Sequence, residues 1–271
     1  MKYEVLKEFR AVEAVVSLDL TYTFEKIKRD IYNTFIVDNS LEPIELQSLN
    51  QIMQNANRLV SVFNLPHGFQ HLKSLKLSFM PIDDSYFNNL RGLKNLDELV
   101  IEDTGIGNEA LSHLVALKNN LCFLNVTGNR KINDDSVPIL VLFEKLVVLL
   151  LNDTTISMDG IRKFVSETSS TELSQISIPP LCRKYLNKRN EIYCVEHKEG
   201  MKVDPLEVEF MSLSEIRQQL MFHYKVNNNI NIVGLKEELE ELLKEILKRR
   251  HNDAKAMQLA GGRDQFEKKK N

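Results

Sequence analysis

The sequence predicts an α/β fold in which short parallel strands alternate with short helices. Three observations carry this prediction. The pattern L-x-x-L-x-L recurs four times, at steps of 24, 25 and 25 residues. The first half of each unit alternates apolar and polar residues, as a strand does, and the second half spaces apolar residues three to four apart, as a helix does. The strand columns are Leu72, Leu75, Leu77; Leu96, Leu99, Ile101; Leu121, Leu124, Val126; and Leu146, Leu149, Leu151. The helix columns are Phe87, Leu111, Val137, Ile161 and Leu90, Leu114, Leu140, Phe164.

A single unit of this kind is too small to bury both of its apolar faces, so neighbouring units must stack. We expect the repeats to occupy residues 59–180 as a solenoid, with a parallel sheet on the concave face and helices on the convex face. A degenerate fifth strand with Ile176 and Ile178 follows, and Pro179-Pro180 then interrupts the pattern.

These units resemble leucine-rich repeats. The turns Ile-Gly-Asn-Glu-Ala-Leu, Ile-Asn-Asp-Asp-Ser-Val and Ile-Ser-Met-Asp-Gly-Ile are similar to those of the ribonuclease-inhibitor-like and F-box substrate-receptor repeats. The resemblance implies a leucine-rich-repeat solenoid that binds other proteins. The cysteine column of the F-box variety and an N-terminal F-box pattern are absent from the sequence.

Residues 1–58 are predicted to be degenerate repeats or an N-terminal cap, and we favour degenerate repeats. Leu18 and Leu20 repeat the strand spacing with Val15. Two helices are expected after them, and Leu59 with Val62 is expected to start an irregular strand. The predicted helix positions are Phe24, Ile27 and Ile31, then Leu46, Leu49, Ile52 and Met53.

The outward side chains of the central strands predict a binding surface. The leucines of L-x-x-L-x-L point into the core, so the third and fifth residues point out of the sheet. In the central repeats several of these outward residues are apolar, and a contiguous apolar patch commonly marks an interaction site. The candidate partner-binding residues are Val100, Phe123, Asn125, Val148, Leu150, Glu98, Glu102 and Lys76. The alternative is that the chain's own C-terminal segment covers this patch.

Beyond the repeats, we expect a linker or C-terminal cap at 181–211, a helical hairpin at 212–250 and a disordered tail at 251–271. Ser212 and Glu215 match a capping box, which marks the start of the first helix. After Gly234 a second amphipathic helix begins, with leucines on one face and glutamates on the other. Apolar residues thin out after His251.

The hairpin is similar to the SAP motif, a helix-extended-helix DNA-binding module, because its second helix begins Gly-Leu-Lys-Glu-Glu-Leu. The resemblance implies that Lys236 and the basic cluster Lys248, Arg249 and Arg250 contact nucleic-acid phosphates. The exposed glutamates of the same helix would repel phosphate. We therefore favour a helix that docks on protein through its leucines, which are Leu239, Leu242, Leu243 and the neighbouring Ile246.

The sequence carries no pattern that indicates an enzyme, a cofactor or a metal site. It lacks the phosphate-binding, dinucleotide-binding, zinc-protease and nucleophile-elbow motifs. Cys182, Cys194 and His197 leave a zinc site one ligand short. The pairs Asp83-Asp84 and Asp134-Asp135 are expected to cap the following helix.

The function expected from these observations is a non-enzymatic protein-interaction scaffold in the cytoplasm or nucleus. Three widely spaced cysteines predict a reducing compartment, and the apolar runs are too short to span a bilayer, so no membrane partner is expected. A net charge of −3 excludes a polycation that coats nucleic acid. Two alternatives stay open, a nucleic-acid-associated factor acting through the SAP-like hairpin and a ubiquitin-ligase substrate adaptor.

Overall fold

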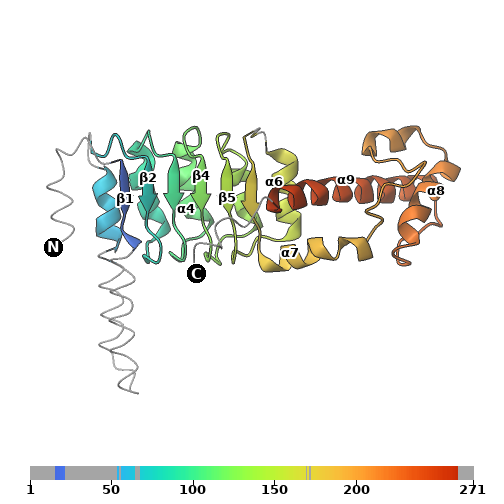
Figure 1. Ribbon diagram of the computed structural model, residues 1–271, viewed down its shortest axis with the longest axis horizontal. Coiled ribbons are helices and arrows are strands. Elements are labelled where there is room, and N and C mark those ends of the chain that lie inside the picture. The colour runs from blue at the N-terminus through green and yellow to red at the C-terminus, as the bar shows by residue number, and fades with distance from the viewer. Residues whose placement is uncertain are drawn as a thin grey trace, which may run out of the picture.

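The computed structural model describes residues 16–21, 54, 56–64, 68–168, 170 and 172–261. Its centre is a six-stranded sheet whose strands follow one another in the order of the sequence. Each strand pairs in parallel with the next, which confirms the predicted α/β class with a parallel sheet (Figure 1). The strands are β1 (Ser17–Asp19), β2 (Ser74–Lys76), β3 (Glu98–Val100), β4 (Phe123–Asn125), β5 (Val148–Leu150) and β6 (Gln175–Ser177).

From β2 onward, short helical segments return the chain from each strand to the next. They are η3 (Asp84–Gly92), α4 (Asn108–Leu114) with η4 (Val115–Leu117), η5 (Asp134–Ser136) with α5 (Val137–Leu140), and α6 (Met158–Glu167). All eight predicted helix positions, from Phe87 to Phe164, are buried. The first return is a 3-10 helix rather than an α-helix, a form that suits short connections.

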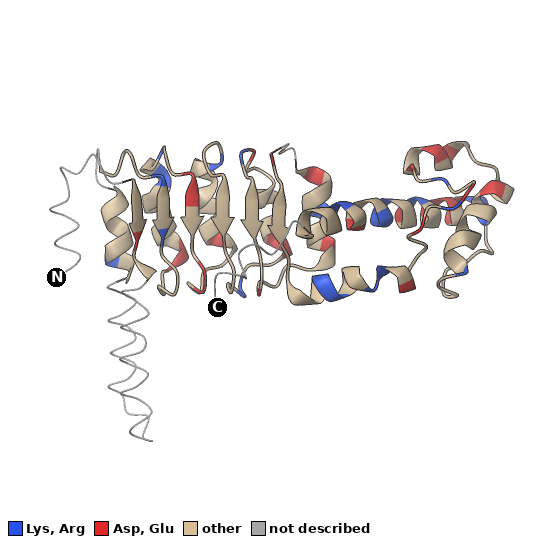
Figure 2. Ribbon diagram, in the orientation of Figure 1, with Lys and Arg blue, Asp and Glu red and all other residues tan. Residues whose placement is uncertain are grey.

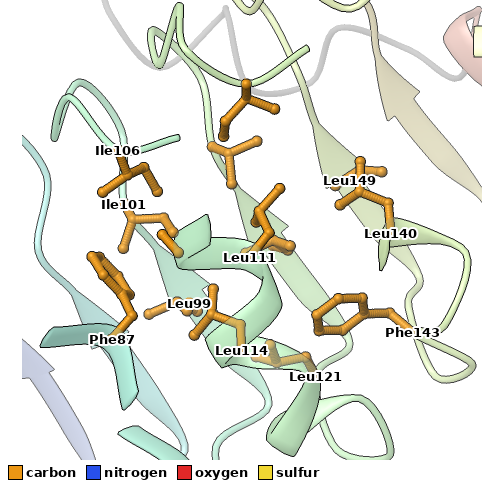
Figure 3. Close-up of a cluster of buried hydrophobic side chains, with 14 of the residues drawn as sticks. Phe87, Leu99, Ile101, Ile106, Leu111, Leu114, Leu121, Leu140, Phe143 and Leu149 are labelled. Atoms are coloured by element: carbon orange, nitrogen blue, oxygen red, sulfur yellow. The ribbon is translucent and has the colours of Figure 1, made fainter. Parts of the chain in front are cut away.

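The leucine columns form one continuous core between the sheet and the helices. Leu75, Leu99, Leu124 and Leu149, at the centres of successive strands, are fully buried. Figure 3 shows Leu99 and Ile101 packed near Leu111 and Leu114 of the return helix. Each apolar column of the sequence therefore runs through successive layers of one core.

A buried amide links two of these layers. The side-chain amide of Asn129 donates to the carbonyl oxygens of Ile101 (2.8 Å) and Val126 (2.9 Å). Its oxygen accepts the backbone N–H groups of Thr104 (3.1 Å) and Gly105 (2.9 Å). Asn129 thus satisfies backbone groups that the stacked turns would otherwise bury without partners.

The acidic residues of the turns join one repeat to the next, which differs from the expected capping. The Asp84 carboxylate accepts the N–H groups of Gly107 (3.0 Å) and Ala110 (3.2 Å), at the start of α4 one repeat later. Asp134 likewise accepts the N–H of Ser157 (2.7 Å), which precedes α6. A parallel stack brings each turn beside the next helix N-terminus, so these carboxylates cap their neighbour's helix.

At the N-terminal end, β1 pairs with β2 and Leu20 is buried, so residues 17–19 extend the sheet by one strand. The strand expected near Leu59 and Val62 is wrong. Residues 56–61 are helical and η2 (Val62–Asn64) follows, because Leu59, Val60 and Phe63 share one buried side of a helix. The helices predicted between Phe24 and Met53, and Val15, lie outside the described residues.

The C-terminal part contains α7 (Pro180–Asn187), η6 (Arg189–Glu191), η7 (Pro205–Phe210), α8 (Leu213–Tyr224) and α9 (Lys236–Ala260). The predicted capping box is present, with the N–H of Ser212 donating to Glu215 Oε2 at 2.7 Å. The tail predicted from His251 is wrong up to Ala260, because α9 continues and buries Asp253, Ala256 and Ala260. Residues 262–271 of that tail lie outside the described part.

Helix α9 joins two hydrophobic cores. Leu239, Leu243 and Leu247 pack into a second core built with α8 and the 192–211 segment, whereas Ala256 and Ala260 pack into the core of the repeats. Helix α9 contacts α6 and β6, so its second half covers the last strand of the sheet. The segment 181–211, expected to be a linker or a C-terminal cap, is packed at both ends: Cys182 and Leu186 belong to the first core, and Tyr193 and Val208 to the second.

A buried ionic cluster fixes α9 to the last repeat. Asp253 is fully buried and accepts hydrogen bonds from Arg162 Nε (2.8 Å) and the Tyr193 hydroxyl (2.7 Å). Arg162 also lies over the Tyr185 ring, 4.8 Å from its centroid. Burial and the bond to Asp253 raise the pKa of Tyr193, which keeps its hydroxyl a donor. The charge of Asp253 is therefore compensated inside the protein.

Candidate functional site

The candidate site is the outer face of the sheet, defined as the first and third side chains of each strand. Strand register places Glu98, Phe123 and Val148 in one row across β3, β4 and β5. Val100, Asn125 and Leu150 form the second row. Adjacent strands lie about 4.8 Å apart, so the two rows bring these predicted residues into one surface.

The centre of this face is apolar and its ends are polar. Val100, Phe123, Val148 and Leu150 form what we call the apolar patch, and each is half-buried. Ser17 and Ser74, then Asp19 and Lys76, continue the two rows on one side, and Gln175 and Ser177 continue them on the other. Figure 2 shows the strands mostly without charge colouring. An apolar centre with a polar rim is the usual anatomy of a protein-binding surface.

Asn125 was expected to contact a partner, but its side chain is largely inaccessible. The register places its side chain on the outer face, but only 8 % of the residue is exposed. Its Oδ1 accepts the backbone N–H of Thr127 at 2.9 Å, which folds the amide back over the end of β4. Asn125 therefore shapes the strand end and offers little surface to a partner.

The charged candidates lie beside the apolar patch. Lys76 Nζ is 3.7 Å from Glu98 Oε1, so these two neutralise each other on the β2–β3 side. An exposed pair of this kind contributes about 0–1 kcal/mol and can re-form with a partner's charges. Glu102 is half-buried just after β3, beside the exposed Asp103. The rim near β3 is consequently acidic.

The C-terminal segment does not lie over the apolar patch, as far as the described residues reach. Helix α9 packs on α6 and β6, and α8 and η7 pack on α9. Figure 1 shows these elements extending beyond the last strand, away from β3, β4 and β5. The alternative in which this segment covers the patch therefore fails for residues 172–261.

The four candidate nucleic-acid residues do not form one basic surface. Lys236 and Lys248 stand at positions about 18 Å apart along α9 at the usual helical rise. Arg249 pairs with Glu245 at 2.6 Å, and Arg250 donates to the carbonyl oxygen of Val195 at 2.9 Å. Figure 2 shows acidic and basic residues interspersed along α9. Arg250 has a structural role here, which its place in a basic run could not reveal.

The docking leucines of α9 are used within the chain itself. Leu239, Leu243 and Ile246 are buried in the second core, and Leu242 packs partly against it. The surface predicted to dock on the solenoid or on a partner is therefore occupied by α8 and the 192–211 segment.

The cysteines do not gather with other ligands. Cys122, Cys182 and Cys194 are free thiols, and burial raises the pKa of Cys182 to about 11. Within the described ranges, no three His, Cys, Asp or Glu side chains come together in a way that could hold a metal ion. None of the helices in those ranges combines the length and apolar character needed to cross a membrane.

Comparison with known proteins gives no family for the chain: a scan against protein-family models and a search of curated proteins both find no match.

Proposed function

We propose that the chain is a non-enzymatic protein-interaction scaffold whose repeats form a leucine-rich-repeat solenoid. The outer face of the sheet is the binding surface, and the apolar patch at β3, β4 and β5 is its centre. The scaffold acts in the cytoplasm or nucleus, a proposal supported by its three free thiols.

The observation that carries this proposal is the arrangement of the outer face. Half-buried apolar side chains stand in register on three adjacent strands, between polar residues at both ends of the rows. A rigid sheet holds these side chains in place at little conformational cost on binding, which favours association. The aromatic ring of Phe123 is the type of side chain that commonly anchors an interface.

The experiment uses the full chain as bait in cell extract, with bound proteins quantified by mass spectrometry. Phe123→Asp and Leu150→Asp place charge at the centre of the face. Each is expected to reduce recovery of the specific partner by about tenfold or more, because an unpaired charge in a desolvated interface is costly.

Leu142→Asp is the control, because Leu142 is exposed and lies outside the strands. The Leu142→Asp variant is expected to recover the same partner as the wild type. All variants are first shown to keep the wild-type circular dichroism spectrum and melting temperature. If the same proteins are recovered with all three folded variants, the outer face is not the binding surface.

A further inference from the structure

Two surface features of the C-terminal part complement each other and have no role in the proposed sheet-face function. The first is the turn ridge, which consists of Leu206 and Phe210 on η7. Their exposed fractions are 77 % and 86 %, whereas Val208 between them is fully buried in the second core. Burial of Val208 fixes the turn and holds both apolar side chains in solvent, where large apolar groups are unfavourable.

The ridge carries negative charge. Segment 202–210 contains three acidic residues, Asp204, Glu207 and Glu209, against one basic residue, Lys202. Lys202 is bound to Glu207 at 2.8 Å. A partner site for this ridge must therefore offer an apolar pocket with basic groups at its rim.

The second feature is such a pocket, which we call the α7 pocket. It is a shallow, open pocket of about 340 Å³ beside α7 and η6, lined by Leu181, Lys184, Tyr185, Lys188, Glu191 and Ile192. Leu181 is 80 % exposed at its edge. Segment 180–191 contains four basic residues against one acidic residue, Glu191, which lies 3.9 Å from Lys188.

The ridge of one chain does not reach the pocket of the same chain. Figure 2 shows the acidic turn before α8 and the basic α7 on opposite sides of α9. Val208 is held in the second core and Cys182 in the first, so both elements are fixed where they stand. Only a second molecule can bring the two features together.

We propose that a second copy of this chain occupies the α7 pocket with its turn ridge, giving a head-to-tail association. Phe210 and Leu206 enter the apolar pocket, while Glu207 and Glu209 face Lys184 and Lys188. A dimer formed in this way keeps one ridge and one pocket unused, so the contact propagates to longer species. Because two apolar side chains and one open pocket carry the contact, we expect it to be weak, to depend on concentration and to weaken as salt screens the charges.

The test is sedimentation velocity of the full chain over a range of concentrations at low and at physiological salt. The wild type is expected to show a weight-average sedimentation coefficient that rises with concentration. A ridge variant, Leu206→Ser with Phe210→Ser, and a pocket variant, Leu181→Ser with Lys184→Glu, should each associate more than about tenfold more weakly. Val233→Ser, at another exposed apolar position, should behave as the wild type.

The decisive sample is a mixture of the two variants. The pocket variant keeps an intact ridge and the ridge variant keeps an intact pocket, so the mixture should form one-to-one dimers and no longer species. The altered side chains are exposed, so both variants should keep the wild-type melting temperature. A wild type that stays monomeric at all concentrations overturns the proposal, as does a mixture that stays monomeric. Self-association lost through Phe123→Asp and kept in the ridge variant would place the contact on the sheet face instead.

Discussion

At the scale of single residues, the backbone is left-handed at one shared position after each of β2, β3, β4 and β5. Phe79, Asp103, Gly128 and Asp153 occupy this position in four successive repeats, with φ between 51° and 80°. Two of the four are aspartate, which tolerates this conformation better than most residues. The shared conformation is a backbone signature of the repeat that the apolar columns alone did not reveal.

Gly128→Ala should destabilise the protein by about 1–3 kcal/mol. The backbone at Gly128 has φ +80°, and an added Cβ would lie 2.1 Å from Asp103 Oδ1. Gly105 has φ +79° and open space around an added Cβ, so Gly105→Ala should be destabilised only by the strain of a left-handed backbone at alanine. Gly92→Ala, also in open space, should be nearly neutral. Urea denaturation of the three variants ranks them, and equal stability of all three would contradict this account.

His223 makes the stability depend on pH. Its Nδ1 accepts the N–H of Cys194 at 3.2 Å, and its Nε2 is buried without a hydrogen-bond partner within the described part. Burial, followed by the nearby charge of Arg250, lowers the pKa of His223 to about 4. As the pH falls from about 6.5 to 4, the unfolded chain takes up a proton that the folded chain does not. The unfolding free energy should therefore fall by up to about 3 kcal/mol in this window.

His223→Asn is the matched variant, because the Asn oxygen can accept the Cys194 N–H without titrating. Denaturation at pH 7 and pH 4.5 should show that the variant loses less unfolding free energy on acidification than the wild type does. Other acidic groups titrate equally in both proteins, so the difference isolates His223. Parallel losses in the two proteins would show that His223 does not cause the effect.

At the scale of elements, each strand depends on its central leucine, which packs between the layers of its two neighbours. Leu124→Ala removes a fully buried side chain from β4 and should cost about 2–5 kcal/mol. Leu142→Ala, at an exposed position, should cost less than about 0.5 kcal/mol. Thermal denaturation compares the two variants. An unchanged melting temperature for Leu124→Ala would contradict the assignment of a layered core.

The attachment of α9 to the last repeat depends on its buried charge pair. Asp253→Asn should destabilise the protein by about 3–5 kcal/mol, because it removes the buried carboxylate at Arg162 Nε and leaves only the exposed Asp159, 2.7 Å from Nη1. Arg162→Met with Asp253→Leu removes both charges, so the double variant should lose less stability than the sum of the losses of Arg162→Met alone and Asp253→Leu alone. A double-mutant cycle in urea measures this coupling. Additive losses would mean that the two side chains act independently.

The elements of the repeats were predictable because they depend on local periodicity. The strand and helix columns follow from spacing, and Ser212 with Glu215 marks the start of α8 in the sequence alone. The end of α9 was not predictable in this way. Ala256 and Ala260 give a weak apolar signal, and they are buried because α9 lies against α6 and β6, a contact between residues far apart in the chain.

At the scale of the whole molecule, the outer face was predictable in position and less so in detail. The alternation of strand residues placed Val100, Phe123, Val148 and Leu150 together, and strand register confirms their order. The burial of Asn125 and the anchoring of Arg250 depend on hydrogen bonds to backbone groups that the sequence does not identify. The alternating pattern therefore locates the surface, and tertiary contacts decide which of its polar residues are available.

The central claim is that a protein partner binds the apolar patch of the sheet. Hydroxyl-radical footprinting of the chain, with and without its purified partner, tests this most directly because it reports side-chain exposure residue by residue. We expect the reactivity of Phe123, Val148 and Leu150 to fall severalfold in the complex, while that of Leu142 stays unchanged. Unchanged reactivity at the three patch residues, with protection elsewhere on the molecule, would contradict the account.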